Sequence, residues 1–133
     1  MIFADASALI AIIAGEPEGD RLADLLEPER VRLCSALSVW ETIAGLCHSY
    51  TFSVPAARTH VRRFLETGNF QFAGIGEREF DLAVDAYAEY GKGRHPAALN
   101  MGDCYAYACA KANRAKLLFT GEDFAKTDIS AAR

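Results

Sequence analysis

Short runs rich in apolar residues alternate with longer stretches of helical periodicity along nearly the whole chain. The short runs predict strands at Ile2–Ala4, Arg32–Cys34, Phe70–Phe72 and Lys116–Phe119. The longer stretches predict helices at Ala8–Ala14, Glu18–Leu26, Ser35 or Ser38 to Tyr50, Ala56–Glu66, Glu77–Tyr90 and about Gly102–Ala112. This alternation indicates an α/β fold with a mainly parallel central sheet covered by helices. A further short strand around Ile129 is left open.

Two local patterns refine these elements. Asp5 or Ser7 can cap the first helix, because short polar side chains bond the free backbone N–H groups of a first turn. In the helix Glu77–Tyr90, helical spacing assigns the apolar stripe to Phe80, Val84 and Tyr87, with Tyr90 beside them.

Length and charge narrow the class of protein. With 133 residues, the chain is predicted to form one domain, residues 1–133. Its apolar opening is too short to span a bilayer and contains Asp5, so we predict no membrane segment. The net charge of −4 argues against a protein that binds nucleic acid by bulk positive charge. Cysteines 34, 47, 104 and 109 lack metal-site spacing and are predicted to be reduced core residues of a cytoplasmic protein.

Three carboxylates stand alone in apolar stretches. Asp5 is the only charged residue in 1–15, Glu41 the only one besides His48 in 33–57, and Asp103 the only acid or strong base in 95–110. Burial of an unpaired carboxylate is costly, so such groups are paired, heavily hydrogen-bonded or bound to metal. The arginines fall mostly in polar stretches, which favours metal. Helix capping is the alternative for Asp5 and Asp103.

A fourth acid, Asp123, follows the last predicted strand as Asp5 follows the first. Parallel strands bring such positions to one edge of the sheet. Because 121–128 is polar, an ordinary surface position is the alternative for Asp123. Oxygen ligands select Mg²⁺ or Mn²⁺ over zinc, and such a cation suits phosphodiester hydrolysis.

Four segments resemble the PIN domain of VapC-type toxins: ADASAL at 4–9, SVWE at 38–41, LNMGDCYAYA at 99–108 and TGEDF at 120–124. The resemblance implies a PIN-like α/β/α sandwich of four or five strands. It also implies an endoribonuclease dependent on Mg²⁺ or Mn²⁺, the toxin of a type II toxin–antitoxin module. Such toxins are usually homodimers, silenced by a cognate antitoxin that provides their only link to DNA.

The resemblance also assigns residues. Asp5, Glu41 and Asp103 match the core acids of the family, and Asp123 matches its more variable fourth acid. Matches at Ser7, Asn100 and Thr120 are polar positions beside the acids, where a side chain can orient a carboxylate or water. Local capping and turn bonds are the alternative for all three. Asp128 is interpreted as a surface residue, with an auxiliary acid as the alternative.

The sequence also contains two groups of basic residues that could contact a substrate. Two basic clusters are candidates for RNA phosphate contacts, with a solvated surface as the alternative: Lys92, Arg94 and His95, and Arg58, Arg62 and Arg63. The large side chains of Trp40, Phe64 and Tyr87 are predicted to pack in the core or in a dimer interface. His48 and His60 are predicted to be helix residues without a chemical role.

Three other classes compete with the ribonuclease hypothesis. A phosphoryl-transfer enzyme of the haloacid-dehalogenase type needs a second Asp two positions after Asp5, where Ser7 stands. A receiver domain needs paired acids near the first strand, and these are not evident. The third is a PIN-like domain that only binds, and the retained acids argue against it.

Overall fold

The chain folds around a four-stranded parallel sheet with the strand order β3-β2-β1-β4. The computed structural model describes residues 1–132, so Arg133, the last residue of the predicted domain, lies outside the described residues. The strands are β1 (Ile2–Ala4), β2 (Arg32–Cys34), β3 (Gln71–Phe72) and β4 (Lys116–Leu118). The predicted parallel sheet is therefore confirmed. Near Ile129, an isolated bridge between Leu117 and Ala131 stands where a fifth strand was left open.

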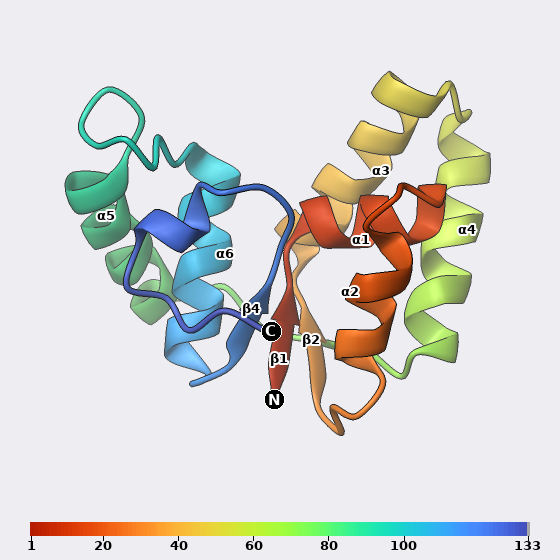
Figure 1. The fold of residues 1–133 in the computed structure, drawn as a ribbon, viewed down its shortest axis with the longest axis horizontal. Helices are drawn as coiled ribbons and strands as arrows, with labels where there is room; N and C mark the ends of the chain where they lie inside the picture. The colour runs from red at the N-terminus through yellow and green to blue at the C-terminus, as the bar shows by residue number, and fades with distance from the viewer. Residues whose placement is uncertain (133) are drawn as a thin grey trace.

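Helices cover both faces of the sheet. They are α1 (Ala6–Ala14), α2 (Gly19–Leu26), α3 (Ala36–Tyr50), α4 (Val54–Thr67), α5 (Glu77–Tyr90) and α6 (Met101–Ala112), followed by the short 3-10 helix η1 (Phe124–Lys126). Helices α5 and α6 lie on one side of the sheet and α1 to α4 on the other (Figure 1). Within residues 1–132, no helix is long and apolar enough to cross a membrane.

Alternation along the strands explains why both faces are buried. Side chains of successive strand residues point to opposite faces. Phe3 and Leu117 accordingly join the core beneath α5 and α6, whereas Ile2 and Leu118 join the core beneath α1 and α2. Cys34 belongs to a third cluster with residues of α3 and α4. Such two-sided burial is typical of parallel sheets and accounts for the nearly uncharged strands.

Helix α5 turns a different face to the core from the one its sequence predicts. The assigned stripe is largely exposed: Phe80 is 52%, Val84 48% and Tyr87 48% accessible. The buried row consists instead of Glu79, Ala83, Ala86 and Tyr90. Small alanines let α5 pack closely on α6, which is itself rich in buried small residues. The stripe prediction was therefore wrong for Phe80, Val84 and Tyr87.

Of the other residues predicted to lie in the core, some are buried and others are exposed. Cys34, Cys104 and Cys109 are buried and Cys47 is half-buried, and all four are free thiols. Phe64 is half-buried and packs against two of the core clusters. Trp40 is 67% exposed, so a core position is wrong for Trp40 as it is for Tyr87. His48 and His60 lie on α3 and α4, as expected.

Candidate active site

Asp5 leaves the carboxyl end of β1 and caps α1. One of its carboxylate oxygens accepts hydrogen bonds from the Ser7 backbone N–H at 3.1 Å and the Ser7 hydroxyl at 2.6 Å. Only 5% of Asp5 is exposed. Burial raises the pKa of this carboxyl group, and the bonds from Ser7 offset part of the rise. Asp5 therefore does cap α1, as the alternative prediction held. The hydrogen bonds from Ser7 occupy only one oxygen of the Asp5 carboxylate, however, and do not neutralise its charge.

Ser7 ties Asp5 to the loop after β4. Its hydroxyl donates to Asp5 and accepts a hydrogen bond from the Thr120 backbone N–H at 3.1 Å. This places Ser7 beside the carboxylate, where it can orient Asp5. Thr120 takes part through its backbone. The link holds the carboxyl ends of β1 and β4 together at the edge where the candidate acids meet.

Glu41 brings a second carboxylate from α3. Its helix begins after Ser35, whose side chain forms a capping box with Ser38. Burial, followed by the charges of Asp5 and Asp103, raises the pKa of Glu41 to about 7. The half-buried Glu41 carboxylate therefore faces the acids of β1 and α6.

Asp103 lies in the first turn of α6. It shares a capping box with Asn100: the Asp103 backbone N–H donates to the Asn100 side chain at 2.9 Å, and the Asn100 backbone N–H donates to Asp103 at 3.1 Å. Burial raises the pKa of Asp103 to about 6, with the charges of Asp5 and Asp123 adding to the rise and the Asn100 bond opposing it. Like Asp5, Asp103 both caps its helix and lies among the other acids.

Asp123 is the most accessible of the four acids. It is exposed and directly precedes η1, whose Phe124 is buried and packs on Phe119 with ring centres 5.2 Å apart. The charge of Asp123 acts on Asp103, which locates Asp123 at the open side of the group. We refer to Asp5, Glu41, Asp103 and Asp123 together as the acid pocket, a term that denotes these four side chains rather than a cavity.

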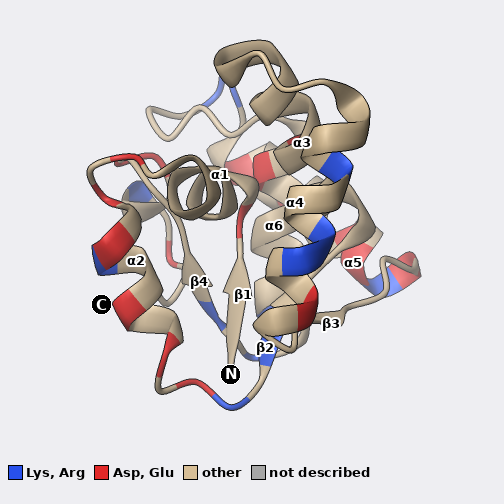
Figure 2. Cartoon of the chain, turned by 90° about the vertical axis from the view of Figure 1, so that its right-hand side faces the viewer, with Lys and Arg blue, Asp and Glu red and all other residues tan. Residues whose placement is uncertain are grey.

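The acid pocket lacks cationic partners. Among the ion pairs of residues 1–132, none involves Asp5, Glu41, Asp103 or Asp123. Figure 2 shows acidic segments where β1, α1 and α3 meet, whereas α4 and the far end of the sheet carry both basic and acidic segments. Like charges that gather without a cation are destabilising. A bound divalent ion would remove that penalty.

The donor chemistry of the acid pocket fits Mg²⁺ or Mn²⁺. These ions prefer carboxylate oxygens, and Mg²⁺ retains several of its own waters. Within residues 1–132, no group of three or more His, Cys, Asp or Glu side chains lies close enough together to hold a metal ion by direct ligation alone. Water retained by the ion can bridge it to a carboxylate that does not reach it directly.

Asp128 has a different role from the acid pocket. It accepts hydrogen bonds from the Tyr107 hydroxyl at 2.6 Å and from Lys111 at 2.7 Å, and these partners lower the pKa of Asp128. These contacts fasten the C-terminal segment to α6. A surface anchor, rather than an auxiliary acid, describes the observed contacts.

The basic candidates lie outside the acid pocket. Lys92 is exposed, and Arg94 stacks over the Tyr87 ring at 5.0 Å. His95 accepts a hydrogen bond from the Ala97 backbone N–H at 3.0 Å and packs edge-on against Tyr90, so it supports the loop. The three arginines of α4 are all exposed: Arg58, Arg62 and Arg63.

Gly102 adjoins the acid pocket. It lies in the segment 99–108 that resembles the family, but no role was predicted for it from the sequence. It is buried in the first turn of α6, directly against the Glu41 carboxylate. The available signal was a helix-disfavouring glycine next to an isolated acid. Sequence spacing alone does not reveal which neighbour requires the missing side chain.

The PIN-domain family profile matches residues 2–130 of the chain. Ribonuclease VapC30 of Mycobacterium tuberculosis is 39% identical over 126 residues, which cover 95% of this chain and 94% of that protein. Ribonuclease VapC of Mycolicibacterium smegmatis is 38% identical and covers 96% of each chain. A VapC ribonuclease of Rhizobium meliloti is 35% identical and covers 97% of this chain and 99% of its own.

A solved structure supports the same fold. The crystal structure of Mycobacterium tuberculosis VapC20, described as a toxin that cleaves the sarcin-ricin loop, superposes with a TM-score of 0.76. The match covers 97% of this chain and 96% of VapC20, at 17% sequence identity. At that identity the likeness concerns the fold, and it agrees with the predicted PIN-like α/β/α arrangement.

Proposed function

Because this chain belongs to the PIN-domain family and, within it, to the VapC ribonucleases, we propose that it is an endoribonuclease toxin of a type II toxin–antitoxin module. It hydrolyses RNA phosphodiester bonds with the help of Mg²⁺ or Mn²⁺. The observation that carries the proposal is the gathering of uncompensated carboxylates from β1, α3 and α6, where the charges of Asp5 and Asp103 raise the pKa of Glu41. An RNA substrate places the activity in the cytoplasm.

The residues of the acid pocket have distinct tasks in this proposal. Asp5, Glu41 and Asp103 hold the cation, and the exposed Asp123 completes its surroundings on the open side. Ser7 holds the Asp5 carboxylate through two hydrogen bonds, and the Asn100 backbone N–H holds the Asp103 carboxylate through one. When bound, the cation supplies a more acidic attacking water and offsets charge that develops on the phosphate. Without it, the pocket repels RNA.

RNA reaches this pocket past a surface of mixed charge. Lys92 is the freest basic group of the loop before α6, since Arg94 stacks on Tyr87 and His95 is held by the loop. We assign to Lys92 a phosphate contact of the ordinary salt-sensitive kind. With a net charge of −4, the protein relies on few such contacts and on the cation itself.

The antitoxin has a suitable docking place on the face of α3 and α4. A groove of about 370 Å³ between these helices and β3 is lined by Val39, Trp40, Val61 and Phe72, and its charged wall residues are Arg58, Arg62 and Glu66. Trp40 and Phe72 are 67% and 59% exposed, which is unusual for such large apolar side chains. An apolar segment of the antitoxin with acidic residues at its edges complements this groove. DNA contact belongs to the antitoxin.

We assign the homodimer interface to the exposed apolar row of α5, which does not pack in the core. Phe80, Val84 and Tyr87 form an exposed apolar stripe, and Met101 at the start of α6 is 67% exposed. Val84, Tyr87 and Met101 also line one hollow between the two helices. A second copy of the chain would cover this surface with its own matching stripe, as a two-fold interface requires.

Cleavage of RNA by the purified protein tests the proposal. We expect cleavage of single-stranded RNA with Mg²⁺ or Mn²⁺, none in EDTA, and none by Asp103→Asn with either ion. DNA of the same sequence serves as the substrate control. Full activity in EDTA, or unaltered activity of Asp103→Asn, would refute a metal-dependent nuclease. Folded, metal-binding protein without any RNA cleavage would indicate a binding module instead.

A further inference from the structure

Gly102 occupies a position where any side chain would collide with a carboxylate of the acid pocket. A Cβ atom built on Gly102 would lie 2.0 Å from Glu41 Oε2, 2.5 Å from its Cδ and 2.6 Å from its Oε1. Real Cβ atoms essentially never approach another heavy atom closer than 3.0 Å. A side chain at 102 and the Glu41 carboxylate therefore cannot both occupy these positions.

The backbone of Gly102 gives no reason for a glycine. Its φ angle is not among the positive values found in residues 1–132, whereas Gly15 and Gly121 have φ of 71° and 80°. Gly102 also lies inside α6, where glycine is less favourable than alanine. Local propensity thus favours a side chain at this position, and the reason for its absence lies in the neighbouring element.

The other crowded helical glycines face different kinds of neighbour. A Cβ on Gly19 would meet the backbone carbonyl of Ala11, and one on Gly45 would meet the apolar end of Ile10. Those two glycines allow helices to pack closely. At Gly102, all three nearest atoms belong to the ionisable end of Glu41. The space is thus occupied by a group of the candidate site.

We propose that Gly102 is a positioning residue, whose missing side chain forms the recess that holds the Glu41 carboxylate beside Asp103. This inference rests on the proposed function, because Glu41 gains from that location only when a cation binds there. A methyl group at 102 would displace the Glu41 carboxylate from its place among Asp5 and Asp103. That movement relieves repulsion in the metal-free protein and removes a ligand from the metal-bound one.

Gly102→Ala should therefore separate stability from cation binding. In EDTA, we expect the melting temperature of the variant to equal or exceed that of the unsubstituted protein. In Mn²⁺, we expect its affinity for the ion, measured by calorimetry, to fall by about 10-fold or more. The rise in melting temperature that Mn²⁺ causes should shrink accordingly.

Gly76→Ala is the matched control. Gly76 precedes the first turn of α5, and a Cβ there would meet only Glu79 Oε1, at an ordinary 3.5 Å. We expect this variant to bind Mn²⁺ with unchanged affinity. A loss equal to that of Gly102→Ala would show that adding a methyl group at a helix start weakens binding generally, and would overturn the proposal.

A double-mutant cycle tests whether Glu41 mediates the effect. In a Glu41→Ala background the recess is empty, so adding Gly102→Ala should cause no further loss of Mn²⁺ affinity. A further loss in that background, or a Gly102→Ala protein that binds Mn²⁺ normally, would overturn the positioning role while leaving the proposed function intact. If the unsubstituted protein shows no Mn²⁺ binding, the metal site itself fails and this proposal fails with it.

Discussion

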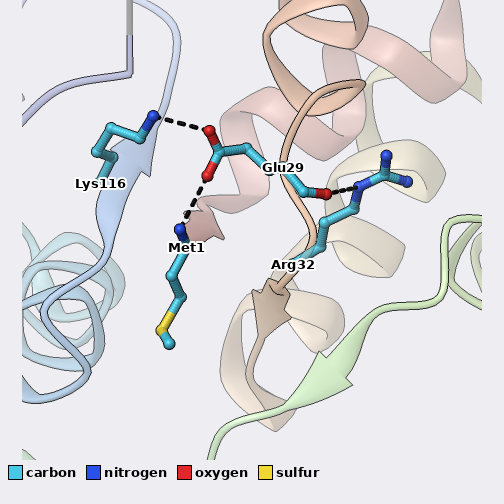
Figure 3. Close-up of polar contacts among 4 residues, drawn as sticks. All are labelled: Met1, Glu29, Arg32 and Lys116. Carbon is cyan, nitrogen blue, oxygen red and sulfur yellow. Dashed lines mark hydrogen bonds and ion pairs between the residues drawn. The ribbon is translucent and has the colours of Figure 1, made fainter.

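A single acid, Glu29, and a group of acids stand at opposite ends of the same strands and have opposite electrostatic surroundings. At the amino ends of β1 and β4, Glu29 accepts hydrogen bonds from the Met1 α-amino group at 2.9 Å and from Lys116 at 2.8 Å (Figure 3). The Glu29 backbone carbonyl also accepts from Arg32. At the carboxyl ends lies the acid pocket, where Asp5, Glu41 and Asp103 have no such partners within the described residues.

The pKa shifts follow the partners. Hydrogen bonds from Lys116 and from the α-amino group lower the pKa of Glu29. Burial and neighbouring acids raise the pKa of Glu41 to about 7. The pairing of Glu29 with cations stabilises the fold by itself. The clustering of Glu41 with other acids destabilises the fold unless a cation binds there. The comparison teaches that unpaired acids, rather than acids as such, distinguish the end of this sheet at which we propose the active site.

Asp5→Asn gives the largest expected effect. The amide can still cap α1, since Asn is as good an N-cap as Asp, but it loses the charge that a cation needs. We expect RNA cleavage to fall by at least about 10²-fold. Unfolding by urea in EDTA should show equal or greater stability than that of the unsubstituted protein. A variant that unfolds spontaneously would show instead that Asp5 is mainly structural.

Glu29→Gln reverses this pattern at the other end of the sheet. It removes the charge that pairs with Met1 and Lys116, both of which are partly exposed. We expect the free energy of unfolding to fall by about 1 kcal/mol, with RNA cleavage unchanged at temperatures well below the transition. Cleavage that fell as steeply as in Asp5→Asn would erase the distinction between the two ends.

The pH dependence of stability should differ in sign between Glu41 and Glu29. The folded pKa of Glu41 is raised from 4.5 to about 7, so its stabilising contribution is present below 4.5 and lost as the pH rises through 7. The folded pKa of Glu29 is lowered, so its contribution is present above the unfolded pKa and lost as the pH falls.

Urea titrations in EDTA at several pH values measure this difference. Relative to the unsubstituted protein, Glu41→Gln should gain stability as the pH rises from 4.5 to 7. The deficit of Glu29→Gln should shrink as the medium becomes acidic. Parallel pH curves for the two variants would contradict the opposite surroundings assigned to these acids.

Asp128→Asn has the smallest expected effect. Its carboxylate is paired with Lys111 and Tyr107 but is 54% exposed, so solvent screens the pair. We expect a loss of about 0.5 kcal/mol or less in the free energy of unfolding and little change in cleavage. A large loss of cleavage without a loss of stability would move Asp128 from the paired acids to the functional group.

The isolation of three acids could be recognised in the sequence because charge is rare within apolar stretches. Asp5, Glu41 and Asp103 were identified on that basis, and the structure brings them together. The strands were also predictable, since a buried parallel sheet leaves short runs that are mostly apolar. Asp123 could not be supported in this way, because its polar surroundings resemble any surface loop.

The faces of the helices were harder to predict. In α5, the rows 79, 83, 86, 90 and 80, 84, 87 both follow helical spacing, and larger apolar side chains favoured the second. Close packing against α6 selected the first row, with Ala83 and Ala86 at the contact. The exposure of Trp40 was missed for the same reason. Its hydrophobicity predicts burial, whereas in the described residues it lines an open groove. Tertiary contacts decide such choices, and hydrophobicity alone does not reveal them.

The central claim is that the acid pocket is the place where this protein binds its divalent cation. The most direct test is the anomalous diffraction of a crystal of the protein grown with Mn²⁺. We predict a strong anomalous peak bounded by the carboxylates of Asp5, Glu41 and Asp103, which disappears in a crystal of Asp5→Asn. An acid pocket without a peak at a Mn²⁺ concentration that supports RNA cleavage, or a peak that persists in Asp5→Asn, would contradict the claim.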